Sequence, residues 1–436
     1  MRFLSRVGMV LVVAGLLPGA GRAHDSLCGT LGDALGAEAA GLVREWVVQV
    51  PFDSSAWRLE QVVVGNGLVV AQSGDGGVAA IAVGPEGTPP APPGTVLWSQ
   101  RIGRQGRTIQ PAAVAASVVV VDDDDEVIGL NRATGHVFWR ETVAHGLAAG
   151  GVASGDWIYM PLDINGIIRL AVNPLQPRVF LAEEPSPGKK RKKKDPTAGR
   201  ESESVVPRSI DAGGSITLPP VRYGNGVAWC TDTGKVITLT RKTKQWIRCV
   251  FDLGGTPAGP LLVQADTIFA TSNAGHVAAI QTGPAGLKTK WGLTLGATPT
   301  GPTIRAGDTL VVPLAAGGAL GIDAATGQLL WQSDVARTPL AADAERLWCL
   351  DATGRLALLD PATGERLAWY CTGPFTLPVV NTATDRLVLA SPRGTVVSLA
   401  PLAPVGATAK DAPASGPADP AATPPAADRK ADDPSE

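Results

Sequence analysis

The densest group of side chains that could do chemistry is the acidic run Asp122–Glu126, which reads DDDDE. Carboxylates this close together can bind a cation weakly, but the run lacks the central Gly and terminal Glu of a calcium-binding loop. Apolar stretches end at Val121 and begin again at Val127. We therefore interpret the run as a solvated hairpin tip, whose like charges discourage pairing with another sheet edge.

Positive charge gathers in Lys189–Lys194, inside the low-complexity basic insertion 185–204. Such a run can meet phosphates or acidic lipid, but no aromatic residue interleaves with it to stack on bases. The formal net charge of the chain is −2, which gives the chain as a whole no attraction for nucleic acid. We interpret the insertion as a flexible loop between two sheets and expect no nucleic-acid partner.

Metal-ligating residues are few. The four histidines are His24, His136, His145 and His276, and none is spaced as a metal pair, so we expect no zinc site. His24 at a mature N-terminus could hold copper with its amine, although one such residue is a weak signal. The sequence has no nucleophile elbow, P-loop or H-E-x-x-H motif, and the Gly-rich stretch 74–77 fits a turn.

Residues 1–23 have the features of a secretory signal peptide, with an apolar run at Val7–Leu17 and small residues before the expected cleavage site. The run is too short to span a bilayer comfortably. We therefore expect no membrane span, a mature chain that begins at His24, and a periplasmic or extracellular location. Cys28 could mark a lipoprotein, but Leu27 is not the small residue such a site requires, which favours soluble export.

Five cysteines are an odd number for an exported protein. We place Cys230 and Cys249 in the second and fourth strands of one sheet, and Cys349 and Cys371 likewise. Two strand spacings separate such residues by roughly 9–10 Å, too far for a disulfide. We expect most of these cysteines to be buried thiols that pack as small hydrophobic residues.

The elements that must position any site are repeated hairpins. Gly321–Trp331 reads GIDAATGQLLW, and the pattern recurs at Gly129–Trp139 and, one residue longer, at Leu358–Trp369. In each copy a tight turn needs a Gly that accepts positive φ, and a Trp follows that can cover the neighbouring sheet. The turn glycines are Gly135, Gly327 and Gly364. Three copies of one hairpin predict a repeat architecture.

The repeat has a period of about forty residues, with four short strands in each unit. The residues that end the units are Trp46, Trp98, Trp139, Phe180, Trp246, Trp291, Trp331 and Trp369. Phe180 replaces the Trp in a degenerate unit, and we place the insertion 185–204 after that unit. The last unit lacks its Trp strand, whereas Glu45–Pro51 is a Trp strand without a sheet, so pairing the two closes a ring.

We predict an all-β fold, an eight-bladed β-propeller of four-stranded antiparallel blades over residues 42–401, closed by an N-terminal strand. Apolar residues make up 44% of the chain, ample for the core of such a ring. Residues 24–41 form a lead-in segment. Residues 402–436 are rich in Ala, Pro, Asp and Lys, and we expect a disordered tail.

The hairpin resembles the pyrroloquinoline-quinone-type propeller repeat, A-x-D-x-x-x-G-x-x-x-W. Asp323, Gly327 and Trp331 match this pattern, and Asp360 matches it with the longer spacing. The family contains quinone-dependent alcohol and glucose dehydrogenases, and also non-enzymatic propellers such as the outer-membrane-assembly lipoproteins. Within the repeat, the Asp can accept backbone N–H bonds in the turn, and the Trp packs between sheets. These residues therefore indicate sheet docking and not a cofactor.

The resemblance implies two functions. The family's alcohol oxidases use an adjacent-Cys disulfide, a calcium ion and an Asp base, but this chain has no Cys-Cys pair and no evident cluster of the six to eight oxygens that calcium requires. We therefore expect a non-enzymatic, monomeric scaffold that binds an envelope protein or peptide, with no catalytic residue, cofactor or metal. The alternative is a quinone-dependent dehydrogenase, or a quinone-binding relative, with pyrroloquinoline quinone and calcium in the central funnel.

Overall fold

The computed structural model describes residues 37, 41–84, 91–106, 110–123, 126–173, 208–242, 245–283 and 286–401. The predicted signal peptide, most of the lead-in segment, Phe180, the insertion 185–204 and the tail 402–436 lie outside these residues. The elements of the described part are β-strands throughout. A helix long and apolar enough to cross a bilayer does not occur among the described residues.

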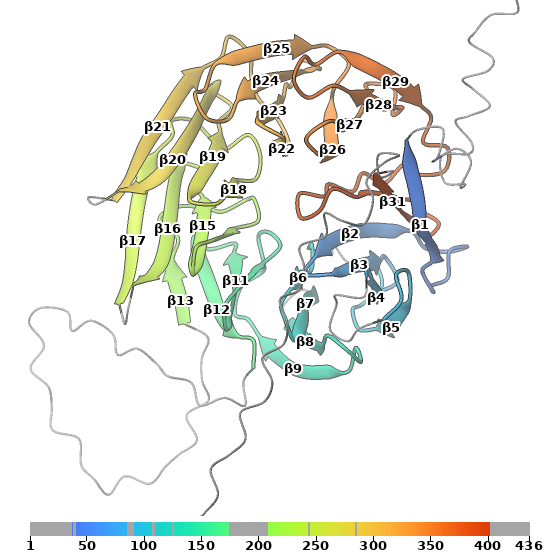
Figure 1. Cartoon of the computed structure of the whole chain (residues 1–436). Coiled ribbons are helices and arrows are strands. Elements are labelled where there is room, and N and C mark those ends of the chain that lie inside the picture. Colours follow the sequence, from blue (N-terminus) through green and yellow to red (C-terminus); the bar gives the residue numbers. More distant parts are fainter. Residues whose placement is uncertain are drawn as a thin grey trace, which may run out of the picture. The chain divides into compact units, whose positions relative to one another are not determined.

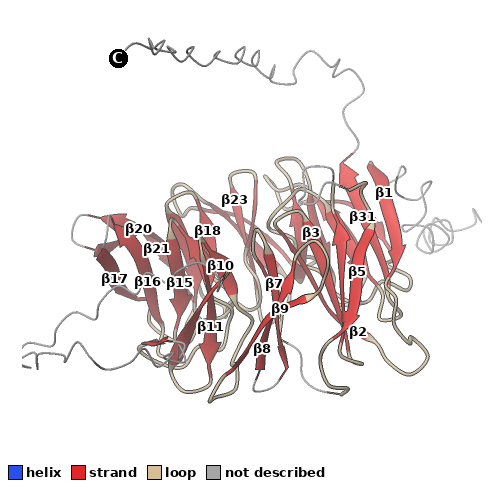
Figure 2. Ribbon diagram, turned by 90° about the horizontal axis from the view of Figure 1, so that it is seen from below, coloured by secondary structure: helices blue, strands red, loops and turns tan. Residues whose placement is uncertain are grey.

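The strands of the unit Met1–Pro401 form eight antiparallel sheets around a central axis (Figure 1). The fold is therefore an all-β, eight-bladed β-propeller, as the repeat predicts. Figure 2 shows the same blades from the side, standing next to one another with turns and loops on both faces. We number the blades I to VIII in chain order.

In blades I to IV the strands are β2 (Leu59–Gly65), β3 (Leu68–Ser73), β4 (Gly77–Ala82) and β5 (Val96–Arg101); β6 (Ala113–Val114), β7 (Val118–Asp123), β8 (Glu126–Asn131) and β9 (Val137–Thr142); β10 (Val152–Ser154), β11 (Trp157–Leu162), β12 (Gly166–Ala171) and β13 (Arg208–Asp211); and β14 (Val221–Tyr223), β15 (Gly226–Cys230), β16 (Lys235–Lys242) and β17 (Gln245–Asp252). Within each blade the strands pair in chain order, from the axis outward.

In blades V to VIII the strands are β18 (Leu262–Gln264), β19 (Thr267–Thr271), β20 (His276–Gly283) and β21 (Gly286–Thr294); β22 (Ile304–Ala306), β23 (Thr309–Pro313), β24 (Ala319–Asp323) and β25 (Leu329–Ser333); β26 (Thr338–Ala342), β27 (Leu347–Leu350), β28 (Leu356–Leu359) and β29 (Arg366–Tyr370); and β30 (Leu387–Ala390), β31 (Thr395–Pro401) and β1 (Leu42–Gln49). In blade VIII an isolated bridge between Leu377 and Ala390 stands in place of the innermost strand.

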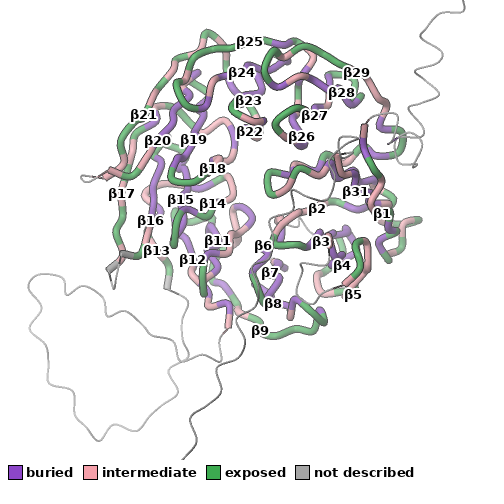
Figure 3. The backbone as a smooth tube through the Cα atoms, in the orientation of Figure 1, coloured by how far each residue is buried: buried purple, intermediate pink, exposed green. Residues whose placement is uncertain are grey.

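Middle strands are buried on both faces because they are continuous apolar runs, whereas outer strands alternate (Figure 3). Strand β23 reads TLVVP and is buried at every residue, while β25 exposes Leu329 and Leu330. The buried side chains of the described residues form eight apolar clusters, and each cluster joins two neighbouring blades. The core of this protein therefore lies in the junctions between blades.

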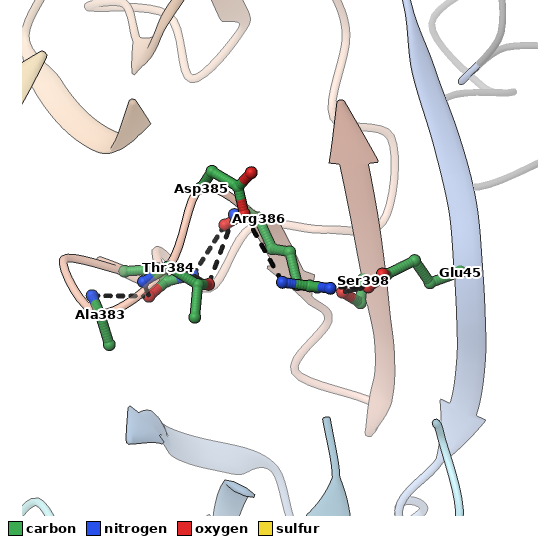
Figure 4. Close-up of polar contacts among 7 residues, drawn as sticks. Glu45, Ala383, Thr384, Asp385, Arg386 and Ser398 are labelled. Atoms are coloured by element: carbon green, nitrogen blue, oxygen red, sulfur yellow. Dashed lines mark hydrogen bonds and ion pairs between the residues drawn. The ribbon is translucent and has the colours of Figure 1, made fainter. Parts of the chain in front are cut away.

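The ring is closed as the sequence predicts. Strand β1 pairs antiparallel with β31, from Leu42 opposite Pro401 to Gln49 opposite Thr395. A partly buried polar contact reinforces the pairing (Figure 4): the Glu45 carboxylate accepts from Arg386 Nε at 2.8 Å and from Ser398 Oγ at 3.0 Å. The first and last strands of the propeller are thus held by both backbone and side chains.

Blade III differs from the prediction. Its outer strand is β13, which pairs with β12 through Ile210 opposite Ile167. The insertion 185–204 therefore falls inside blade III, between its third and fourth strands, and not between two blades. Phe180 lies outside the described residues and outside the outer strand. The sequence of β13, RSID, has no turn Gly and no Trp, so the hairpin pattern could not locate it.

Candidate functional site

The Trp residues of the repeat reach the next blade of the ring. At three junctions the indole N–H donates to a backbone carbonyl in the third-to-fourth-strand turn of the following blade. These bonds run from Trp98 to Arg132 at 2.7 Å, from Trp291 to Ala324 at 3.0 Å and from Trp331 to Pro361 at 2.8 Å. Each of the three indoles thus links its own blade to the following blade.

The turn glycines receive these indoles. A Cβ atom at Gly327 would lie 2.6 Å from the Trp291 ring, and one at Gly364 would lie 2.5 Å from the Trp331 ring. Both glycines also have positive φ, +79° and +70°, which disfavours any side chain. Gly135 receives Trp98 in the same way. The Gly and the Trp of the repeat therefore act as a pair across two blades.

The Asp of the repeat holds the turn that carries this Gly. Asp323 Oδ1 accepts from the backbone N–H groups of Ala325 at 3.0 Å and Thr326 at 2.7 Å. Hydrogen bonds from Thr326 hold the pKa of the Asp323 carboxyl below its ordinary value. Asp360 accepts from Ala362 N at 2.7 Å in the equivalent turn. These carboxylates shape turns and are engaged with their own backbone.

The other unit-ending Trp residues of the described part lack this hydrogen bond. The indole nitrogens of Trp46, Trp139 and Trp246 are buried without a hydrogen-bond partner. Trp46 packs on Gly94 of blade I, and Trp369 lies under the guanidinium groups of Arg355 and Arg366. Each of these indoles still packs within the propeller.

Cysteine chemistry is not supported by the described residues. Cys230, Cys249 and Cys349 are free. The expectation of buried thiols is confirmed for Cys230 and Cys349, whereas Cys249 is only partly buried. Burial raises the pKa of the Cys230 thiol to about 12 and also raises the pKa of the Cys349 thiol, so both remain protonated and unreactive. Cys371 is disulfide-bonded, contrary to the expectation of a thiol, although it does not pair with Cys349.

The acidic run supports the neighbouring loop. Asp122 Oδ1 accepts from the backbone N–H of Gln110 at 3.0 Å, and Asp123 Oδ1 accepts from that of Arg104 at 3.1 Å. The described residues contain no group of three or more His, Cys, Asp or Glu side chains placed to hold a metal ion. The run joins β7 to β8, as the predicted hairpin requires. It differs from the predicted solvated tip in that Asp123 is buried and Asp122 partly buried, because both accept hydrogen bonds from the neighbouring loop.

A pocket of about 140 Å³ lies among the innermost strands of blades V to VIII. The sequence offered no signal for it, because its residues belong to four blades and to no motif. Four aliphatic residues line the pocket, together with five residues that have polar or charged side chains. The aliphatic residues are Leu262, Val263, Ile304 and Ala342, and the others are Gln264, Arg305, Asn381, Thr382 and Thr384.

Arg305 is the charged residue of the lining. Its Nε donates to the Gly307 carbonyl at 2.6 Å, its Nη1 donates to Gln264 Oε1, and its Nη2 contacts Asp308 Oδ1 at 2.9 Å. Three of the five guanidinium N–H groups are thereby used and two remain. The three contacts hold the guanidinium in one orientation beside the pocket.

Asn381 connects the pocket lining to the segment that contacts β1. Its Nδ2 donates to Thr384 Oγ1 at 2.6 Å and to the Arg386 carbonyl at 2.8 Å. The side chain of Arg386 in turn binds Glu45 of β1. The pocket wall and the contact that closes the ring therefore share one segment, residues 381–386.

The lining does not fit pyrroloquinoline quinone with calcium. That cofactor is a rigid tricyclic molecule with three carboxylates, whereas sites for ligands of such size measure roughly 300–1,000 Å³. The pocket has about 140 Å³ and one guanidinium, and its lining contains no carboxylate for calcium. A smaller group matches it better.

Comparison with known proteins agrees with the propeller fold. A family model described as outer membrane protein assembly factor BamB matches residues 56–283, 195–357 and 283–402. BamB from Moraxella catarrhalis is 17% identical with a TM-score of 0.60, over 82% of this chain and 97% of that chain. Sqt1 from Saccharomyces cerevisiae is 11% identical with a TM-score of 0.57, over 81% and 98%. The computationally designed Ika8 protein is 14% identical with a TM-score of 0.54, over 78% and 95%.

No curated protein sequence matches the chain. The solved structures share only the propeller fold at these identities, but the family model spans nearly all of the ring. The chain therefore belongs to the family of outer membrane protein assembly factor BamB.

Proposed function

We propose that the protein is a non-enzymatic, exported β-propeller that serves as a protein-interaction scaffold in the cell envelope. The observation that carries this proposal is how the repeat is used: the best-preserved Trp, Gly and Asp residues all make contacts between blades or within turns. None of them is left to hold a cofactor. The resemblance that raised the quinone alternative thus rests on residues that build the ring.

Export is supported by two independent features. The N-terminal sequence has the pattern of a signal peptide. Cys371 is disulfide-bonded, and such bonds persist mainly in oxidising compartments such as the periplasm. The family of assembly factors is itself named for the outer membrane.

An interaction surface is available on the outer strands. These strands expose large apolar side chains, and an interaction site on a protein surface is commonly a contiguous group of such side chains. The exposed residues of blades VI to VIII are Leu329, Leu330, Leu367, Val43 and Val47. We propose that an envelope protein or an extended peptide binds the propeller.

The test is a reconstitution. The full-length protein is purified from the envelope with its complexes, and each candidate partner is then expressed separately and mixed with it. We expect a saturable one-to-one complex that forms again from the purified components. In a parallel titration with pyrroloquinoline quinone and calcium, saturable binding with alcohol- or sugar-dependent dye reduction would refute the scaffold function.

A further inference from the structure

The pocket among the innermost strands has a consistent chemical character. Its aliphatic residues belong to the neighbouring blades V, VI and VII, and Ile304 is buried. Its polar residues include one cation, Arg305, and no anion. A site with an aliphatic part and a single guanidinium suits a small molecule or group that carries both a carboxylate and an apolar side chain.

We propose that this pocket binds a carboxylate attached to a small aliphatic group, with the two remaining N–H groups of Arg305 donating to the carboxylate. Planar guanidinium groups bind carboxylates through two parallel hydrogen bonds. The bonds to Gly307 and Gln264 already orient the guanidinium, so binding orders little that is not ordered already. The aliphatic group would contact Leu262, Val263 and Ile304.

Asp308 sharpens the proposal because it competes for the same cation. Its carboxylate contacts Arg305 Nη2 at 2.9 Å, and its side chain is 94% exposed. A ligand carboxylate would approach a guanidinium that already has one anionic neighbour, and the two anions would repel each other. Removing the Asp308 charge should therefore strengthen binding, an effect that a site without a carboxylate ligand would not show.

Two sources present this chemistry: a free branched short-chain acid, and the C-terminal residue of a polypeptide when that residue is aliphatic. The second source rests on the proposed function, since it places the end of a protein partner in the ring, whereas the first does not. The probes are isovalerate, a pentapeptide that ends in valine with a free carboxylate, and the same pentapeptide with a C-terminal amide.

Binding of each probe to the full-length protein is measured by ligand-observed NMR titration. We expect the amide to bind at least about tenfold more weakly than the free acid, as for loss of a charged hydrogen-bond partner. Tight binding of isovalerate with no gain from the peptide assigns the small acid, and the reverse assigns the chain terminus. Equal binding of the acid and amide peptides, together with no binding of isovalerate, overturns the proposal.

Two substitutions at the site and one elsewhere complete the test. Arg305→Gln should weaken binding of the free acid about 10- to 100-fold. Asp308→Asn should strengthen it roughly twofold to fivefold, the range for an exposed ion pair. Lys288→Gln removes a positive charge from the exposed surface of β21 and should change nothing.

Asp308→Asn decides the matter if Arg305→Gln fails to fold, because Asp308 is almost fully exposed. Unchanged or weaker binding in Asp308→Asn refutes the carboxylate site. Partner reconstitution with the same variants separates the two proposals: loss of carboxylate binding with an intact complex would leave the scaffold function standing.

Discussion

The junctions of blades V, VI and VII differ from those on either side of blade III. In the first group, Trp291 and Trp331 each donate to a backbone carbonyl and each pack on a turn Gly. Around blade III, the Trp139 and Trp246 indole nitrogens are buried without a partner. The first group repeats the same indole-to-carbonyl hydrogen bond between blades, whereas the indoles of the second group do not make this bond.

Blade III is held by other means. Its Arg169 guanidinium lies 4.2 Å from the Trp157 ring centre and 5.5 Å from that of Trp246 in blade IV, an arrangement that stabilises by cation–π attraction. Ser154 Oγ is also buried there without a hydrogen bond. Each unpaired buried polar group costs about 1–3 kcal/mol. The comparison shows that a closed ring tolerates unpaired indole nitrogens around blade III, and one more at Trp46, alongside regularly docked junctions.

The largest effect is expected when the ring itself is opened. Deleting residues 24–52 removes β1, and with it the buried side chains of Leu42, Trp46 and Val48. We expect the truncated protein to lose cooperative unfolding in calorimetry, because both edges of the opened ring then expose apolar surface. A truncated protein that melts like the full-length one would show that closure contributes little to either group of junctions.

Removing a docking Trp should distinguish the two groups directly. Trp331→Ala should destabilise by about 3–5 kcal/mol, as for other buried Trp residues. Trp139→Ala should cost less, roughly 1–3 kcal/mol, because Trp139 is only partly buried and its indole nitrogen is unpaired. Urea unfolding of the two variants measures the difference, and equal losses would contradict the comparison.

A smaller change isolates the hydrogen bond. Trp331→Phe leaves the Pro361 carbonyl without its donor, whereas Trp139→Phe removes an N–H that has no partner. We expect Trp331→Phe to be the more destabilising by about 1–2 kcal/mol. If the two variants lose equal stability in urea, ring volume and not the bond to the carbonyl controls docking.

The smallest effect concerns the stability at acid pH of blade VII, one of the blades with a regularly docked Trp. Burial raises the pKa of Asp351, but hydrogen bonds from Thr353 and Arg355 more than offset this, so its pKa lies below the ordinary 3.8. A lowered native pKa means that the ionised carboxylate stabilises the fold above about pH 4 and that this contribution is lost as pH falls further. Asp351→Asn should therefore reduce the fall in melting temperature below pH 4. If the melting temperature of Asp351→Asn falls below pH 4 as that of the unchanged protein does, Asp351 does not contribute to the pH dependence of stability.

Much of the fold was predictable because its repeat leaves chemical traces. Gly321 stands where the repeat has Ala, and a Cβ there would lie 2.0 Å from the Trp331 ring. The small residue and the Trp of the pattern are therefore residues that contact each other in the folded hairpin. Closure was predictable because Glu45–Pro51 is a Trp-bearing strand with no neighbouring strands in sequence, and the last unit lacks such a strand. The outer strand of blade III was not, since RSID lacks both marker residues and a long insertion precedes it.

The candidate site was not predictable from sequence. Arg305, Gln264 and Asn381 come from three blades, and no local pattern shows that their positions converge. The disulfide at Cys371 was missed for a related reason: strand spacing excludes a bond within one blade but says nothing about partners elsewhere in the chain.

The pairing of β1 with β31 has a consequence for the order in which the protein forms. Gln49 donates to the carbonyl of Arg393, 344 positions away in the chain, so the first strand of the propeller cannot pair until almost the last strand is present. Contacts of such long sequence separation form late and slow the folding rate. Nearly the whole propeller must therefore be synthesised before its final blade is complete, and β1 remains without its partner strand during that interval.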